Sequence, residues 1–253
     1  MMDKEDLHLQ KRIQELAERS YSQSIYTFTD FLTLPQIDLC LSMEKQLRYA
    51  GMSFFGGTAD CDRKVLRFGS PEQLGYEEKF PVACLGIEPL AEKYALELTH
   101  RDYLGALMNL GIERENLGDI FIQGKRAWLF CLERIAPFLE KELTQVGRNP
   151  VRASLTETPG ELLLREKREE NILASSARLD GIIAKLYHFS RSKSLELFKA
   201  KKIYVNSRLC ESSSYSLKGG EIISVRGYGK FQFDGIAYET KKGKFSFRLK
   251  VYQ

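Results

Sequence analysis

Residues 178–231 read RLDGIIAKLYHFSRSKSLELFKAKKIYVNSRLCESSSYSLKGGEIISVRGYGKF. Apolar residues near the start of this stretch recur at helical spacing and predict a helix over 177–187. Ser190 is placed to cap a second helix that runs to about residue 200. The residues on the apolar face of the first helix are Leu179, Ile182, Ile183 and Leu186. Two short helices with solvated cations therefore present one basic surface.

Strands and a basic turn follow these helices. The pattern predicts strands at 202–206 and 222–225 with a turn at 216–221 between them. The next turn, at 226–231, sets two cations and two aromatic rings beside glycines, which let a backbone approach phosphate closely. Basic helices, a strand and a glycine-rich basic turn together favour RNA binding.

Charge is distributed unequally along the chain. Residues 171–253 hold sixteen Lys and Arg against six Asp and Glu, whereas residues 1–170 hold twenty-two against twenty-eight, so the net charge of +4 hides a basic C-terminal part. A concentrated positive field attracts polyanions, and phosphate contacts dominate affinity for nucleic acids. The cations alternate with strand and turn signals instead of following one long amphipathic helix, which favours RNA or DNA over an anionic membrane.

Length and composition predict a folded cytoplasmic protein. The 253 residues, 43% hydrophobic and 28% charged, suffice for about two or three domains. The N-terminus is polar, and no apolar run long enough to cross a membrane occurs, so we expect no membrane partner. Five scattered cysteines without a Cys-x-x-Cys pair and three separated histidines predict reduced buried thiols, with neither a metal nor a cofactor. We expect a monomer.

The first 75 residues are expected to form a small helical region. Apolar residues fall on one helical face within 3–26, and Pro35 suits the first turn of a second helix over 34–50. A glycine pair at 56–57 ends this pattern, and a short strand is expected at 64–68.

Residues 76–158 are expected to form a ferredoxin-like domain, which is also the plan of the RNA-recognition motif (RRM). The predicted elements follow the order β-α-β-β-α-β. They are strands at 81–87, 119–123, 127–131 and 151–155 and helices at 103–110 and 135–143. The hairpin lacks the aromatic-rich RNA-recognition signature, so Phe121, Trp128 and Phe130 are predicted to be core. Fold order alone does not establish RNA binding, because this fold hosts many functions.

A charged, turn-rich stretch follows this middle domain. We expect a linker over 159–175 and a separate C-terminal domain over 176–253. The predicted fold class of the whole chain is therefore α+β, with a helical region, a ferredoxin-like or RRM-like domain and a basic C-terminal domain.

Six short motifs in the C-terminal part resemble the RNA-binding domain named after small-subunit ribosomal protein S-four. They are Arg178-Leu179-Asp180, Ser190-Arg191-Ser192-Lys193, Leu197-Phe198, Ile203-Tyr204-Val205-Asn206, Gly219-Gly220-Glu221-Ile222 and Val225-Arg226-Gly227. The resemblance implies an αL-type RNA-binding fold over these residues. Three positions depart from the usual pattern, since Lys201 and Ser207 stand where glycine is common and Glu221 stands where aspartate is common.

The whole chain is also similar to a narrower family, the bacterial YlmH proteins. The motifs that carry this resemblance are Gly56-Gly57, Asp62-Arg63-Lys64, His100-Arg101-Asp102-Tyr103-Leu104-Gly105, Leu110-Gly111-Ile112, Gly118-Asp119-Ile120 and Ser224-Val225-Arg226-Gly227. The resemblance implies binding to the large ribosomal subunit with peptidyl-tRNA, in the quality control that acts on stalled nascent chains. It also implies a link to cell division through gene neighbourhood.

Two motifs resemble catalytic segments but lack their partners. His100-Arg101-Asp102 is similar to a kinase catalytic loop, yet Leu107 stands where the metal-binding Asn is needed. Arg178-Leu179-Asp180 is similar to a pseudouridine-synthase segment, but Gly-Ile-Ile follows it and the remaining chain is too short for that catalytic domain. Two interpretations of His100, Arg101 and Asp102 stay open: a helix start capped by Asp102, or a second RNA surface.

We therefore expect a non-catalytic protein that binds rRNA or tRNA on the ribosome. Arg191 and Lys193 are predicted phosphate clamps, Arg226 and Lys230 are expected to close the basic face, and Tyr228 is expected to stack on a base. The expected RNA-binding residues are Arg178, Arg191, Ser192, Lys193, Lys199, Lys201, Lys202, Asn206, Arg226, Tyr228 and Lys230. Two alternatives stay open: an RNA-modifying enzyme with 80–155 as a degenerate catalytic unit, and a division-linked or translation-linked protein-interaction factor built on the first 170 residues.

Overall fold

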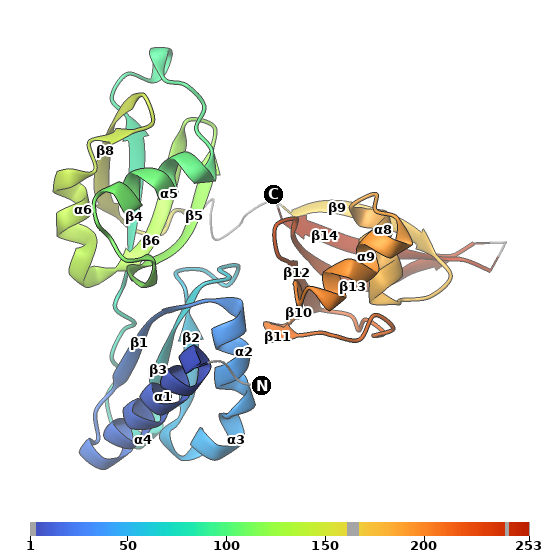
Figure 1. Cartoon of the computed structure of the whole chain (residues 1–253), viewed down its shortest axis with the longest axis horizontal. Coiled ribbons are helices and arrows are strands. Elements are labelled where there is room, and N and C mark those ends of the chain that lie inside the picture. The colour runs from blue at the N-terminus through green and yellow to red at the C-terminus, as the bar shows by residue number, and fades with distance from the viewer. Residues whose placement is uncertain (1–3, 161–166, 241–242, 253) are drawn as a thin grey trace. The chain divides into compact units, whose positions relative to one another are not determined.

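The computed structural model describes residues 4–160, 167–240 and 243–252. Its chain forms two compact units, residues 1–163 and residues 164–253, and each mixes helices with antiparallel sheets (Figure 1). The predicted α+β class is confirmed. No helix within the described ranges has the length and apolar character needed to cross a membrane.

The N-terminal part of the first unit combines helices with a three-stranded sheet. Its elements are α1 (Lys4–Gln23), β1 (Thr27–Leu32), α2 (Leu34–Ser42), α3 (Glu44–Leu47), η1 (Arg48–Ala50), β2 (Met52–Phe55), β3 (Lys64–Phe68) and α4 (Pro71–Leu74). The strands are antiparallel in the order β1-β3-β2. Helix α1 buries Ile13, Leu16 and Ala17, and Thr27 Oγ1 donates to the Leu16 carbonyl at 2.8 Å.

The expectation of a helical region with one strand is therefore wrong. Residues 27–32 read TFTDFL, and threonine and phenylalanine favour strands. This segment pairs with β3 far along the chain, as do residues 52–55. The strand predicted at 64–68 is confirmed, and it lies at the centre of the sheet.

The second part of the first unit has the predicted ferredoxin-like order. Its elements are β4 (Val82–Pro89), η2 (Glu92–Tyr94), α5 (His100–Asn109), η3 (Arg114–Asn116), β5 (Leu117–Gln123), β6 (Arg126–Leu132), η4 (Glu133–Ile135), α6 (Ala136–Glu142), β7 (Gln145–Val146) and β8 (Asn149–Thr156). The sheet order is β5-β6-β4-β8-β7, with antiparallel pairs throughout. Strand β4 thus lies between β6 and β8, as the ferredoxin-like plan requires.

Both faces of this sheet are packed. Leu85, Ile87 and Leu129 join a core with residues of α5 and α6 on one face. On the other face, Phe121 and Phe130 pack with Phe31 of β1, and only 8% and 1% of their surfaces are exposed. The predicted core role of Phe121 and Phe130 is confirmed, and Trp128 is partly buried in the same cluster. The face on which an RRM stacks bases is therefore largely covered by the N-terminal part.

The second unit packs two helices on one face of a six-stranded antiparallel sheet (Figure 1). Its elements are β9 (Lys167–Ala174), α8 (Leu179–Leu186), α9 (Arg191–Lys199), β10 (Ile203–Val205), β11 (Arg208–Leu209), β12 (Glu221–Val225), β13 (Gly229–Glu239) and β14 (Phe245–Tyr252), in sheet order β11-β10-β12-β13-β14-β9. The four apolar residues predicted for the first helix are all buried. Both predicted helices and both predicted strands are confirmed.

The predicted linker over 159–175 is wrong for part of its length. Residues 167–174 form β9, which pairs with β14 along its whole length. Residues 161–166 lie outside the described residues. The sequence KREEN at 167–171 reads as a solvated linker, but an edge strand also carries charges because one of its edges meets water.

Candidate nucleic-acid interface

The first turn of α9 carries three of the predicted RNA-binding residues. The helix is capped by Ser190, whose Oγ accepts the N–H of Lys193 at 3.1 Å and lies 2.9 Å from Oγ of Ser192. The side chains of Arg191, Ser192 and Lys193 are exposed, and Lys193 Nζ lies 3.2 Å from a carboxylate oxygen of Glu196. A helix N-terminus favours an anion, and the two cations strengthen that preference.

Tyr228 lies beside this turn, although it comes from the loop between β12 and β13. Its ring centroid is 4.8 Å from that of Phe189, the residue directly before Ser190. The tyrosine is 41% exposed. The structure thus brings together two segments that are distant in the sequence.

The end of α9 places Lys201 and Lys202 beside Arg226. The N–H of Lys201 donates to the Phe198 carbonyl and that of Lys202 to the Leu197 carbonyl, both at 3.0 Å, as in a Schellman motif. Lys201 has φ of 53°, the left-handed conformation in which glycine is common. The N–H of Arg226 donates to the Lys202 carbonyl at 2.9 Å. The turn therefore forms without its usual glycine.

Arg178 and Lys199 occupy different settings. Arg178 donates to Asp180 through Nε at 3.1 Å and Nη2 at 2.9 Å, and this hydrogen bonding lowers the pKa of the Asp180 carboxyl below its ordinary value. Lys199 is exposed in the last turn of α9. Lys201 Nζ lies 3.6 Å from Glu211 Oε1, and both side chains are exposed. The exposed ion pair of Lys201 is weak, so Lys201 remains open to phosphate, as does Lys199.

Asn206 organises a turn at the far end of β10. Its Oδ1 accepts the N–H of Ile222 at 2.9 Å, and its own N–H donates to the Ile222 carbonyl at 2.8 Å. Asn206 and Ser207 both have positive φ, 49° and 65°, in the two-residue turn before β11. Because Ile203 pairs with Val225, Asn206 and the Lys202–Arg226 contact lie at opposite ends of β10.

The predicted position of Lys230 is wrong. Its neighbour Phe231 points into the core beneath α8 and α9, and side chains alternate across a strand, so Lys230 points to the other face of the sheet. There Lys230 Nζ lies 5.6 Å from the ring centroid of Tyr252, and Lys167 Nζ lies 4.4 Å from the same centroid. Lys230 therefore does not close the surface built on α9.

Two aromatic residues beside the predicted set were missed. The rings of Tyr187 and Phe189 are stacked, with their centroids 5.6 Å apart and 24° between their planes. The ring centroid of Tyr187 lies 6.1 Å from that of Tyr228. The sequence signal for these two aromatic residues is the Tyr-His-Phe run directly before the helix cap at Ser190. His188 between them has φ of 54°, which turns the chain between α8 and α9.

The interpretation of Asp102 as a cap agrees with the structure. Oδ2 of Asp102 accepts the N–H and the Oγ1–H of Thr99, both at 2.7 Å, which forms a capping box at the start of α5. These hydrogen bonds lower the pKa of the Asp102 carboxyl. His100 and Arg101 are exposed beside it, and partial desolvation together with Arg114 lowers the pKa of His100. A direct RNA contact by His100 and Arg101 stays a prediction.

Other motifs of the first unit meet where its two parts join. Arg63 donates to the carbonyls of Phe31, Arg114 and Leu117 at 2.8 to 3.1 Å, and burial lowers its pKa to about 10. Asp119 Oδ2 accepts the N–H of Asp62 at 2.5 Å. These contacts hold the loop at 59–63 against η3 and β5, so this motif set is structural.

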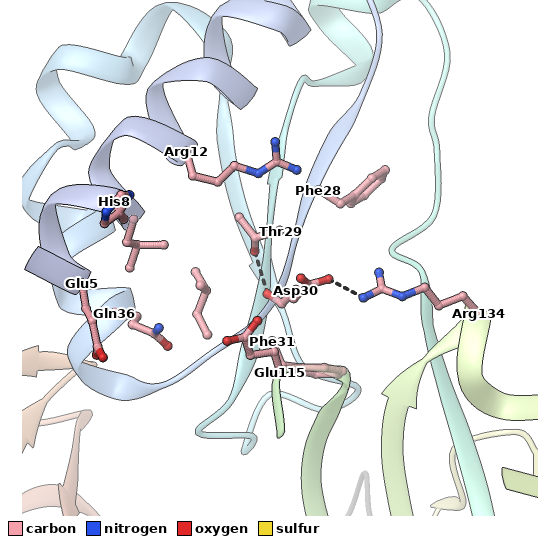
Figure 2. Close-up of a pocket in the computed structure, with 12 residues that line it drawn as sticks. Glu5, His8, Arg12, Phe28, Thr29, Asp30, Phe31, Gln36, Glu115 and Arg134 are labelled. Carbon is pink, nitrogen blue, oxygen red and sulfur yellow. Dashed lines mark hydrogen bonds and ion pairs between the residues drawn. The ribbon is translucent and has the colours of Figure 1, made fainter. Parts of the chain in front are cut away.

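A pocket of about 700 Å³ lies between α1, β1 and the segments that carry Glu115 and Arg134 (Figure 2). Asp30 Oδ1 and Arg134 Nη2 lie 2.8 Å apart on its wall. Its lining residues are Glu5, His8, Leu9, Arg12, Phe28, Thr29, Asp30, Phe31, Leu32, Gln36, Glu115 and Arg134. Three carboxylates face two guanidiniums among them, so the pocket offers little net attraction to a phosphate.

The five thiols are free and buried. Burial raises the pKa of Cys40 and Cys131 to about 12 and that of Cys84 to about 11. No group of three or more His, Cys, Asp or Glu side chains within the described part of the chain could hold a metal ion.

Three matches to known proteins bear on the identity of the chain. The family model described as a putative RNA-binding domain in YlmH matches residues 76–159. The ribosome-associated protein quality control protein P2 of Bacillus subtilis (strain 168) is 32% identical over 222 residues, which cover 86% of this chain and 84% of that protein. The structure of cell division protein ylmH from Streptococcus pneumoniae matches with a TM-score of 0.51 and 17% identity, over 62% of this chain and 93% of that chain.

The Streptococcus structure supports the fold alone at this level of identity. The Bacillus relative is similar over most of both chains, and the family model covers the ferredoxin-like part. The similarity to the YlmH proteins that the sequence motifs indicate is thereby confirmed, and the chain belongs to the YlmH family.

Proposed function

We propose that this protein is a non-catalytic RNA-binding factor of the ribosome. It contacts rRNA and tRNA through the exposed side of α9, on a large subunit that carries peptidyl-tRNA, in the cytoplasm. Its task is the quality control of stalled nascent chains. The names of the matched family domain and of the Bacillus relative support RNA and the ribosome as partners.

The observation that carries this proposal is the cationic surface along α9. Arg191 and Lys193 stand at its capped start, Lys199 lies in its last turn, and Lys202 and Arg226 are joined beyond its end. Cations spread along one helix follow a phosphate backbone better than they follow a small anion.

The cysteine environments support a role without thiol chemistry. A thiol reacts as its thiolate, and burial raises the pKa of Cys40, Cys84 and Cys131 far above neutral pH. These side chains therefore act as core residues, as the sequence predicts.

The test is co-sedimentation of the full chain with isolated ribosomal subunits at stepped salt. Large subunits with and without peptidyl-tRNA are compared, using wild type, Arg191→Ala/Lys193→Ala, and Lys11→Ala/Lys218→Ala as a control with the same charge change. We expect binding to large subunits that only the first variant loses. Equal binding by all three proteins, or none at low salt, contradicts the proposal.

As a second candidate we propose a protein-interaction factor linked to cell division, the role that appears in the name of the Streptococcus structure. The first unit exposes Leu90, Tyr94 and Leu96 in one loop, and Asn149 holds this loop through two hydrogen bonds to the Leu96 main chain. A division-protein partner that co-purifies after nuclease treatment, and is lost in Tyr94→Ser, would support this candidate.

A further inference from the structure

The loops around the start of α9 hold three aromatic rings in contact. Tyr187 and Phe189 come from the turn between α8 and α9, and Tyr228 comes from the turn between β12 and β13. Tyr187 and Phe189 are nearly parallel, while Tyr228 meets Phe189 edge to face at 77°. Each ring therefore supports the next at a fixed angle.

Tyr228, the most exposed of the three rings, does not fill the core. Phe231 and Phe233, in the strand after Tyr228, are 0% and 2% exposed, whereas Tyr228 is 41% exposed. Burial holds the two phenylalanines, but contact with Phe189 holds Tyr228 at the surface. Because Phe189 holds Tyr228 where its ring is partly exposed to solvent, this ring can contact a partner.

The turn that carries Tyr228 is shaped to keep that ring accessible. Gly227 and Gly229 flank it with φ of 86° and 133°, and a Cβ at Gly227 would meet no atom within 4 Å. At Gly229 the nearest atom to such a Cβ is the Tyr187 hydroxyl oxygen, at 3.5 Å. That hydroxyl is buried without a hydrogen-bond partner among the described residues. The two residues that flank Tyr228 therefore carry no side chain that could cover its ring.

Cations and the start of α9 belong to the same two segments that carry these rings. Phe189 leads directly into Ser190 and the exposed Arg191, and Arg226 precedes Tyr228 by two residues. An exposed aromatic ring in the same segments as cations matches a nucleotide, which joins a flat base to an anionic backbone. It does not match a paired base, since an A-form helix keeps its base faces inside the stack.

We propose that Tyr228, held by Phe189 and Tyr187, stacks on one unpaired RNA base whose neighbouring phosphates bind Arg191 and Arg226. This inference rests on the proposed RNA function and names the kind of RNA that the surface takes, which is a loop, bulge or single strand. The protein distinguishes such RNA from a continuous duplex through the ring, while its cations bind both.

The test measures binding of the full chain to two probes by fluorescence anisotropy. One is a single-stranded RNA of twelve nucleotides with one 2-aminopurine, and the other is the blunt duplex of the same sequence. The variants are Tyr228→Leu, which keeps apolar bulk without a π face, Tyr228→Phe, which keeps the ring, and Arg191→Ala. Thermal unfolding establishes that each variant is folded, and Phe189→Leu serves in place of Tyr228→Leu if that variant is not.

We expect Tyr228→Leu to bind the single strand roughly ten-fold more weakly, within the range of about 5- to 150-fold typical for loss of one stacked base. Duplex binding stays unchanged, Tyr228→Phe binds as wild type, and 2-aminopurine fluorescence is quenched by wild type but not by Tyr228→Leu. Arg191→Ala weakens both probes.

An equal effect of Tyr228→Leu on both probes, or no effect on either, overturns the stacking proposal. If Arg191→Ala still weakens binding in that case, the proposed RNA function stands. If Arg191→Ala also changes nothing, the proposed function itself fails.

Discussion

The main-chain N–H of Arg226 donates to the carbonyl oxygen of Lys202 at 2.9 Å. This bond ties the start of β10 to the end of β12 and fixes the main chains of the two cationic residues relative to each other. The proposed phosphate contacts of Lys202 and Arg226 would therefore start from main-chain positions that are already fixed.

The first prediction concerns the salt dependence of RNA binding. If six phosphates are contacted, the log of the binding constant falls against the log of salt concentration with a slope of about −4 to −5. Lys202→Ala/Arg226→Ala removes two contacts and makes the slope less steep by about 1.5. Lys11→Ala/Lys218→Ala removes the same charge elsewhere and leaves the slope unchanged; similar slopes for the two double variants would contradict a surface centred on α9.

A second prediction concerns the end of α9. Lys201 holds φ of 53° at a position where glycine carries no steric penalty, so Lys201→Gly should raise the free energy of unfolding by about 1 kcal/mol. Lys199→Gly places glycine two residues earlier, within the helix, and should lower it by about 0.5–1 kcal/mol. Urea titrations of both variants check the opposite signs, and a loss of stability in Lys201→Gly would contradict the account of this turn.

The third prediction compares alanine substitutions at two glycines of the first unit. At Gly57, φ is 111° and a Cβ would lie 2.1 Å from Cδ1 of Phe130, so Gly57→Ala should destabilise the unit by about 3 kcal/mol or more. At Gly105, inside α5, a Cβ meets nothing within 4 Å. Gly105→Ala should therefore stabilise the unit by about 0.5–1 kcal/mol. Thermal unfolding measures both, and equal shifts would rule out a packing role for Gly57.

The fourth prediction is a pH dependence at Asp180. Hydrogen bonding from Arg178, the largest cause, holds the pKa of this carboxyl below the unfolded value of about 3.9. A depressed pKa in the folded state means stabilisation that is complete above about pH 5 and is lost as the pH falls through the folded value.

The difference in Tm between wild type and Asp180→Asn should therefore be constant from pH 8 to pH 5 and shrink below about pH 4. Glu196→Gln, on the next helix, serves as an exposed carboxylate control. A difference that stays constant down to pH 3 would show that the Arg178 pair contributes nothing through its charge.

Local patterns in the sequence predict α8 and α9 well, because helical spacing and the Ser190 cap act within a few residues. Strands β1 and β9 were missed for the opposite reason. Their partners, β3 and β14, lie far along the chain, and the charges of β9 mask its strand character. Pairing of this kind is decided by tertiary contacts that no short window contains.

The residues of the candidate site also differ in whether local sequence or tertiary contacts decide their positions. Arg191, Ser192 and Lys193 could be placed from the helix cap alone. The side of the sheet on which Lys230 lies depends on strand register, and a shift of one residue reverses it. The contact between Phe189 and Tyr228 joins two loops, so the aromatic set became visible only in the folded chain.

The packing of the N-terminal part on the ferredoxin-like sheet constrains the order in which the chain can fold during synthesis. Phe31 packs against Phe130 but is synthesised long before it. The N-terminal part therefore exposes an apolar face to solvent until β6 has been synthesised. A truncated chain that ends near residue 75 should therefore stick to chaperones or to itself. The second unit has a core cluster drawn only from its own residues, and it is free to fold last and alone.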